Sequence, residues 1–234
     1  MLDAIRGAFA MLLSGDPELW RIIWISFETS MLALAFAAPL AVAIGYAIAS
    51  SRFRGRRVLI WLAQATLSLP TVLVGLLLYM LLSRHGPWGG MHLLFTQPGV
   101  ALGQFVIAMP VLVAFTLAAV QGADPRYAET AIAHGASRWR TMFSVLHEVR
   151  FGVMAAVISG FGRVISEVGC ALMVGGNIAG ETRTMTTAIA LETSKGEFAQ
   201  GIALGMVLIA MALLMNGALL FLQGDAHAAR GHAC

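Results

Sequence analysis

The sequence predicts an all-α polytopic membrane protein. Only 12% of its 234 residues are charged and 59% are hydrophobic, whereas a soluble domain usually carries about a quarter of charged residues. Runs without Asp, Glu, Lys or Arg also exceed the ~20 residues with which a helix crosses the hydrocarbon core; they cover 29–51, 58–83, 93–123 and 198–224. Long apolar runs joined by short polar connections are typical of a bundle of membrane-spanning helices.

Five spans are expected in order along the chain. The second contains Pro70 and the third contains Pro110, and a proline inside a helix is expected to kink it. The fourth span carries two charges, Arg163 and Glu167, which stand four residues apart and therefore share a helix face on which they can pair. The predicted spans cover 21–49, 58–82, 99–120, 151–174 and 201–222.

The spans define a transmembrane domain over residues 21–222, with flanking segments at 1–20 and 223–234. The N-terminal segment is expected to be an interfacial amphipathic helix. A signal peptide is disfavoured because Asp3 precedes the apolar patch and the basic region is almost absent. Cys170 falls in a span and Cys234 in the tail, and two such cysteines form neither a disulfide framework nor a metal site.

The basic residues orient the spans. The first connection, SRFRGRR, the loop at 121–150 and the tail together hold nine arginines, and the opposite side holds five Lys or Arg. Positive residues are enriched in cytoplasmic loops. We therefore expect the N-terminus outside, the C-terminus inside and the loop at 121–150 in the cytoplasm. This pattern explains the net charge of +3 without a nucleic-acid partner.

The cytoplasmic loop contains an unusually polar stretch, RYAETAIAHGASRWRTMF, at 126–143. A short helix is expected before Gly135, which suits a left-handed helix end, and Ser137 is expected to cap a second helix. Four apolar residues of that second helix share one stripe: Trp139, Met142, Phe143 and Leu146. The pattern alone also fits an ordinary helix that lies on the membrane surface.

Glu129, Ala131, Gly135 and Val145 resemble the cytoplasmic signature of ABC importer permease subunits. The chain departs from that signature at Thr130, which replaces an alanine, and at 147–148, where His-Glu replaces Leu-Pro. The resemblance implies that this stretch is a coupling helix that docks on a separate ATP-binding subunit. It assigns that docking to five residues: Glu129, Ala131, Gly135, Ser137 and Arg138.

A second resemblance is to the molybdate, tungstate and sulfate group of these permeases, carried by GRVISEVGCALMVGGNIAGETRTMTTAIALETSKGEF at 162–198. Its end, MTTAIALETSKGEF, is similar to the tungstate branch in particular. The resemblance implies a type I permease core of five to six helices that translocates tungstate by alternating access. The implied partners are two ATP-binding subunits that carry ATP and magnesium, an extracytoplasmic tungstate-binding protein and the lipid bilayer. A homodimer is expected because five helices are too few to enclose a route.

An oxyanion route needs hydrogen-bond donors, and the segment 175–194 is rich in them. The predicted pathway or gate residues are Thr182, Arg183, Thr184, Thr186 and Thr187. Alternatively, these hydroxyls only cap a short extracellular helix. Arg163 and Glu167 are expected to form a structural pair, and the alternative is that Arg163 supplies positive field to the pathway.

No catalytic cluster, metal site or nucleotide-binding loop is expected in this chain. The chain is therefore predicted to be a permease subunit rather than an enzyme. Molybdate or sulfate remains the alternative cargo, and a self-sufficient anion channel remains the alternative from another class of protein.

Overall fold

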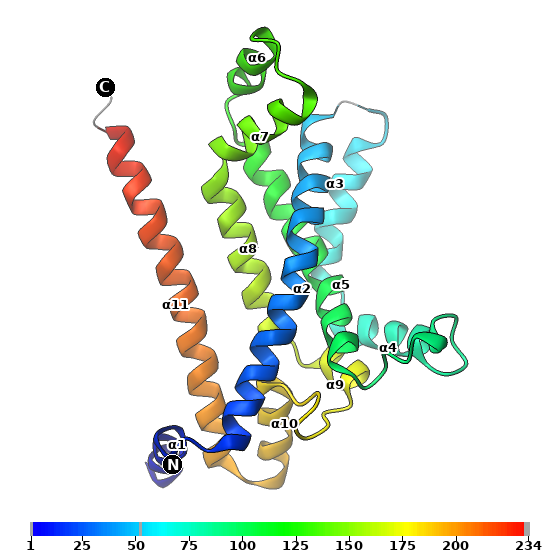
Figure 1. Ribbon diagram of the computed structural model, residues 1–234, viewed down its shortest axis with the longest axis vertical. Helices are drawn as coiled ribbons and strands as arrows, with labels where there is room; N and C mark the ends of the chain where they lie inside the picture. The colour runs from blue at the N-terminus through cyan, green and yellow to red at the C-terminus, as the bar shows by residue number, and fades with distance from the viewer. Residues whose placement is uncertain (1, 52, 232–234) are drawn as a thin grey trace. The chain divides into compact units, whose positions relative to one another are not determined.

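The computed structural model describes residues 2–51 and 53–231 (Figure 1). The end of the predicted tail, including Cys234, lies outside the described residues. Within these ranges the chain forms α-helices and short 3₁₀ helices, without strands. The α-helices are α1 (Leu2–Ser14), α2 (Pro17–Ser50), α3 (Arg56–Ala65), α4 (Thr71–Leu82), α5 (Gln97–Gln121), α6 (Arg126–Ala133), α7 (Arg138–Glu148), α8 (Arg150–Ile165), α9 (Gly169–Gly175), α10 (Met185–Lys195) and α11 (Phe198–Gly231).

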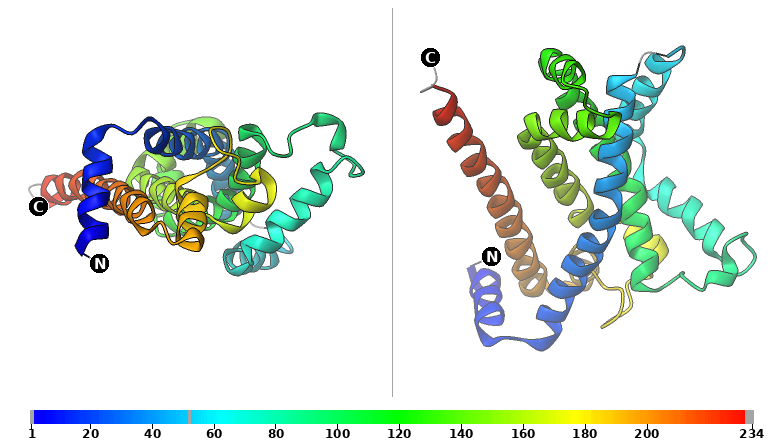
Figure 2. Two further views of the ribbon diagram at one scale, coloured as in Figure 1. Left: turned by 90° about the horizontal axis from the view of Figure 1, so that it is seen from below. Right: turned by 45° about the horizontal axis from the view of Figure 1, so that its top comes forward.

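Two compact units make up the chain, and the long helices contribute to both. Unit 1 comprises Met1–Ala35, Leu69–Ala108 and Phe161–Leu214, and unit 2 comprises Phe36–Ser68, Met109–Gly160 and Met215–Cys234. In unit 1, α9 lies beside α4, as both views in Figure 2 agree. Their shared core consists of Leu78, Leu82, Ile107, Cys170 and Val174.

Glycines allow the backbones of unit 1 to approach closely. A Cβ placed on Gly75 of α4 would lie 2.7 Å from the Cα of Cys170, and one on Gly103 of α5 would lie 2.7 Å from the Cys170 Sγ. Such small-residue contacts are how helices pack tightly in a bilayer, where the hydrophobic effect does not drive helices together. Helix α9 is therefore held between α4 and α5 by contacts that no larger side chain permits.

The same packing recurs in unit 2. A Cβ on Gly45 of α2 would lie 2.9 Å from the Cβ of Thr116 on α5, and one on Gly152 of α8 would lie 2.6 Å from the Cβ of Ala119. Ala37, Ala41, Leu112, Leu117 and Ala156 are buried around these contacts. The C-terminal end of α2 is completed by Arg56, whose guanidinium donates to the carbonyls of Ile48 and Ala49 at 2.9 and 3.1 Å.

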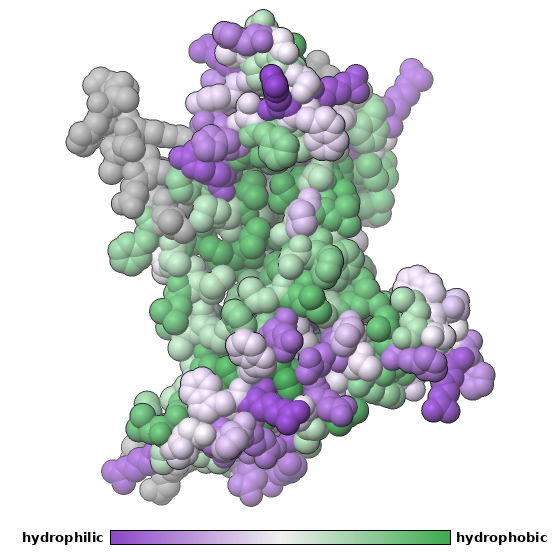
Figure 3. Space-filling view, viewed as in Figure 1, coloured by the Kyte–Doolittle hydropathy of each residue, from purple (hydrophilic) through white to green (hydrophobic). Residues whose placement is uncertain are grey.

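Three predicted spans are confirmed as single helices long and apolar enough to cross a membrane. They are Pro17–Ser50, Gln97–Gln121 and Phe198–Phe221. The first begins at Pro17 rather than at residue 21 because the Asp16 carboxylate accepts the backbone N–H of Glu18 at 2.8 Å and so starts the helix there. In Figure 3, hydrophilic side chains gather over α6 and α7.

The second and fourth spans are not the continuous helices that the sequence predicted. Pro70 breaks the second span instead of kinking it. It has an extended ψ of 117° and stands as the N-cap of α4, because a proline cannot donate to the preceding turn. The fourth span is wrong beyond Ile165: α8 ends there, and α9 begins only at Gly169.

Helix α1 contacts the start of α11 in unit 1. Ala8 of α1 is fully buried, and a Cβ on Gly7 would lie 3.4 Å from the Cβ of Ala199. Phe9 and Leu13 on α1 are exposed by 52% and 86%. An exposed apolar side on a short helix suits the membrane interface that the sequence predicted for this segment.

Candidate functional site

The polar stretch of unit 2 folds into two short helices around a glycine. Gly135 has φ +76°, and the N–H groups of Gly135 and Ala136 donate to the carbonyls of Ile132 and Ala131 at 2.9 and 3.0 Å. These two hydrogen bonds form a Schellman motif, in which the glycine takes the left-handed conformation that ends the helix. The predicted backbone role of Gly135 is confirmed.

Ser137 begins the second helix, as the sequence predicted. Its Oγ accepts the N–H of Arg140 at 3.5 Å, and its carbonyl accepts the Thr141 hydroxyl at 3.1 Å. The buried side of α7 carries Thr141 and Val145. Trp139 and Phe143 of the predicted stripe are instead exposed by 70% and 65%, because α7 packs through the side that carries Thr141 and Val145.

The other predicted coupling residues lie on the surface of this segment. Glu129 stands in the first turn of α6 and is exposed, as is Arg138 in the first turn of α7. Ala131 is half-buried and supplies the carbonyl that ends α6. Tyr127 and Ile132 add apolar area, being exposed by 46% and 62%. Helices α6 and α7 thus present an exposed mixed surface, which is typical of a protein docking site.

The hydroxyl-rich segment of unit 1 is folded against itself. Thr184 caps α10: its Oγ1 accepts the N–H of Thr187 at 3.4 Å, and the Thr187 Oγ1 accepts the N–H of Thr184 at 3.0 Å. Thr182 donates to the carbonyl of Gly175 and accepts the N–H of Ile178. Thr186 donates to the carbonyl of Glu167 at 2.6 Å. All four threonines are buried.

In this conformation the threonine hydroxyls serve the fold, as the capping alternative supposes. A buried hydroxyl that already donates within the chain offers no free hydrogen to an anion. The pathway role of these threonines stays a prediction for another conformation or for an assembly of two copies.

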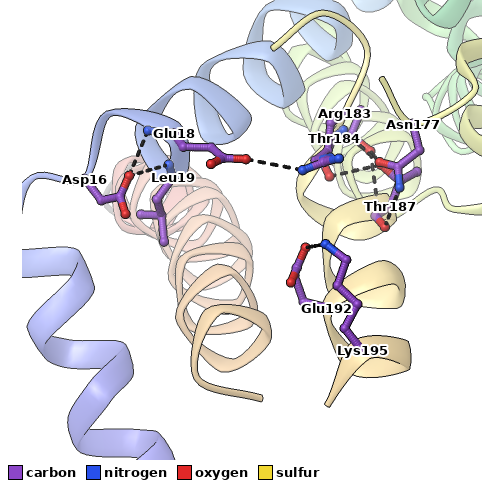
Figure 4. Close-up of polar contacts among 9 residues, drawn as sticks. All are labelled: Asp16, Glu18, Leu19, Asn177, Arg183, Thr184, Thr187, Glu192 and Lys195. Carbon is purple, nitrogen blue, oxygen red and sulfur yellow. Dashed lines mark hydrogen bonds and ion pairs between the residues drawn. The ribbon is translucent and has the colours of Figure 1, made fainter. Parts of the chain in front are cut away.

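Arg183 ties the start of α10 to the start of α2 (Figure 4). Its Nη1 lies 3.3 Å from the Oε1 of Glu18, and its buried Nε has no partner among the described residues. Asn177, earlier in the same segment as Arg183, donates to the carbonyl of Thr187 at 3.5 Å. The Oδ1 of Asn177 is buried and has no partner among the described residues. This corner therefore holds an unsatisfied donor and an unsatisfied acceptor, each of which is costly when buried.

We expect Thr184→Ala to loosen the first turn of α10. Losing an N-cap hydroxyl costs ~1 kcal/mol, which corresponds to about fivefold faster amide exchange in that turn. Hydrogen–deuterium exchange of the peptides covering 184–190 measures this change. Thr193→Ala, an exposed threonine on the same helix, is the matched control and should leave the exchange unchanged; equal rates in both variants would contradict the cap.

Arg163 and Glu167 pair across the end of α8. The Nη1 of Arg163 lies 2.9 Å from the Oε2 of Glu167, so the predicted pair is confirmed. It does not stand on one continuous helix, however. Glu167 follows the end of α8, and its Oε1 accepts the N–H of Cys170 at 3.1 Å in the first turn of α9. The carboxylate therefore stabilises the break that the sequence prediction missed.

Two further contributors were missed from the sequence. The Ser26 Oγ on α2 accepts the N–H of Met185 at 2.6 Å and so helps to cap α10, and Glu18 pairs with Arg183. The one available signal was the position of Ser26 and Thr29 on the same face of α2 as Ile22, a polar pair within an apolar stripe. Nothing in the sequence indicates which distant N–H such a hydroxyl meets.

A family model described as the binding-protein-dependent transport system inner membrane component matches residues 18–224. The chain belongs to this family. Among its relatives, the tungstate uptake system permease protein TupB of Campylobacter jejuni is 35% identical, over 92% of this chain and 90% of that protein. The molybdenum transport system permease protein ModB of Escherichia coli is 30% identical, over 86% of this chain and 90% of that protein.

This transport-family membership is matched by the fold. A solved bacterial ABC transporter involved in the import of the acidic polysaccharide alginate superposes with a TM-score of 0.69 at 20% identity, covering 94% of this chain and 82% of that chain. The chain thus has the all-helical fold of ABC importer permeases. As an inner membrane component of such a system, it is a multi-pass permease subunit, and that family role is not catalytic.

Proposed function

We propose that this permease carries tungstate across the cytoplasmic membrane as part of an ABC importer. The observation that carries the proposal is the match over nearly the whole chain to a tungstate uptake permease at 35% identity. A molybdenum permease is similar at 30% identity, so molybdate is the alternative cargo, followed by sulfate.

In the proposed assembly, two copies of this chain form the translocation unit, with the route along their symmetry axis. Two ATP-binding subunits supply ATP hydrolysis and hold ATP and magnesium. An extracytoplasmic binding protein delivers the oxyanion. The positive charges of the connections support an N-terminus outside and a C-terminus inside.

The exposed surface of α6 and α7 supports docking of an ATP-binding subunit at this segment. Large apolar side chains such as Trp139 and Phe143 stand in solvent there, beside the charged Glu129 and Arg138. Such side chains are favoured at the centres of protein interfaces. Closure of the ATP-binding pair then moves the two α6–α7 segments together, and the outer gate near residues 185–191 opens.

Cellular uptake tests the proposed cargo. Cells with and without this chain are supplied with tungstate, molybdate and sulfate in competition; tungsten and molybdenum contents are measured by mass spectrometry, and sulfate uptake is measured with radiolabelled sulfate. We expect deletion to abolish tungstate uptake selectively and ATP depletion to abolish it equally in the parent cells. Loss of molybdate or sulfate uptake instead would change the cargo, and uptake that survives ATP depletion would indicate a channel.

A further inference from the structure

Arg163 lies on α8 and Glu167 follows its end, and both fall within the fourth span that the sequence predicts. Arg150 and Arg163 both lie on α8, and at a rise of 1.5 Å per residue they are about 20 Å apart along its axis. The hydrocarbon core is about 30 Å thick. With Arg150 in the connection at the membrane boundary, the guanidinium of Arg163 falls at a depth where a charge that faces lipid is strongly disfavoured.

The two partners of the pair are buried unequally. The Glu167 side chain is 3% exposed, whereas that of Arg163 is 36% exposed. Both carboxylate oxygens of Glu167 are in use, one by Arg163 and one by the N–H of Cys170. Among the described contacts of the guanidinium, only Nη1 is hydrogen-bonded. A pair that served the fold alone would gain most by burying its cation as well, since half-exposed donors in a bilayer need water or another ligand.

The exposed side of Arg163 is open and polar. A Cβ added to the neighbouring Gly162 would meet nothing within 4 Å. Ser166, three residues on, is also exposed, and its Oγ bonds to the carbonyls of Gly162 and Arg163 at 2.7 and 3.2 Å. The last turn of α8 thus presents a guanidinium, a hydroxyl and bare backbone, a combination that suits a water-filled route better than hydrocarbon.

Glu167 is held firmly and can therefore fix the guanidinium. Besides its two carboxylate bonds, its backbone carbonyl accepts the Thr186 hydroxyl at 2.6 Å. A guanidinium fixed in this way keeps its remaining N–H donors in a planar fork, which matches a tetrahedral oxyanion. The neighbouring carboxylate offsets its charge, so that the anion is bound weakly enough to be released.

We propose that Arg163 is a transient contact for the oxyanion inside the membrane and that Glu167 is its positioning residue. This inference rests on the proposed function, since it requires an oxyanion as cargo. It develops the alternative that the sequence left open, in which Arg163 supplies positive field to the pathway.

The test compares paired substitutions in the full transporter, reconstituted in liposomes with its ATP-binding subunits and binding protein. Arg163→Gln with Glu167→Gln removes both charges, so that no buried carboxylate is left unpaired. Arg163→Glu with Glu167→Arg keeps an ion pair but moves the cation. The control is Arg84→Gln, which removes an exposed cation from the connection between α4 and α5, outside both the proposed contact and the segment at 175–194.

Tungstate uptake and ATP hydrolysis are measured in parallel on each assembled transporter. We expect both Arg163–Glu167 double variants to assemble and to hydrolyse ATP as the parent does, while tungstate uptake per ATP falls at least about tenfold, as for loss of a charged hydrogen-bond donor. The Arg84 control should retain both activities.

Tungstate uptake at the parental level in either double variant would overturn the proposal. Failure of both double variants to assemble would also overturn it, because the pair would then be structural. These results differ from failure of the proposed function, in which the parent transporter itself shows no ATP-driven uptake of tungstate.

Discussion

Replacing Gly135 with valine is expected to abolish ATP-driven transport while the spans remain folded. Gly135 has φ +76°, a left-handed conformation that costs an L-residue ~1–2 kcal/mol and a β-branched one more. A Cβ there meets no atom within 4 Å, so the strain is confined to the backbone. Relieving it would undo the Schellman bonds at Ile132 and Ala131 and turn α6 relative to α7.

Co-purification of the ATP-binding subunit and uptake by the assembled transporter measure this effect. Gly15→Val is the matched control, because Gly15 also has a positive φ of 69° and open space around it, yet lies between α1 and α2. We expect the Gly135 variant to lose the ATP-binding subunit and the Gly15 variant to keep it. If both variants bind the subunit and transport equally, α6 and α7 do not couple ATP hydrolysis to transport.

Replacing Gly75 with valine is expected to destabilise unit 1 more than any surface substitution. The new Cβ would lie 2.7 Å from the Cα of Cys170 and 3.1 Å from the Cβ of Met173. Because a Cα is backbone, no rotamer change relieves the clash, and overpacking of this kind costs ~1–3 kcal/mol or more. Helix α9 would have to separate from α4.

Thermal unfolding of the purified permease in detergent measures the loss. Gly205→Val is the control, since a Cβ on Gly205 of α11 meets nothing within 4 Å. A lower unfolding temperature for the Gly75 variant alone is the expected result. Equal unfolding temperatures in the two variants would mean that α9 does not pack against α4 as described.

The sequence predicts the features of this fold that depend on one stretch of chain. Length and apolarity identify the spans on α2, α5 and α11, since a helix must be about that long to cross hydrocarbon. Gly135 and Ser137 end and begin their helices through local backbone geometry, which residue type indicates well. The i,i+4 spacing likewise places Arg163 beside Glu167.

The sequence does not predict features that depend on distant partners. The break after Ile165 is maintained by the Glu167 bond to Cys170. The sequence shows two charges in this span, but their i,i+4 spacing fits a continuous helix equally well. Hydroxyls at 182–187 suggest a donor-lined route, but Ser26 on a remote helix helps to cap α10. Whether a hydroxyl faces a cargo or a helix end is decided by tertiary contacts, and composition does not contain them.

ATP-driven tungstate uptake by the reconstituted transporter is the most direct test of function. This chain, its ATP-binding subunit and its binding protein are placed in liposomes, and internal tungstate is measured with ATP, without ATP, and with ATP but without the binding protein. We predict that tungstate accumulates in the first condition alone and that added molybdate or sulfate reduces this accumulation only weakly. Tungstate that enters at the same rate without ATP would contradict the assignment of this permease to an ATP-driven importer.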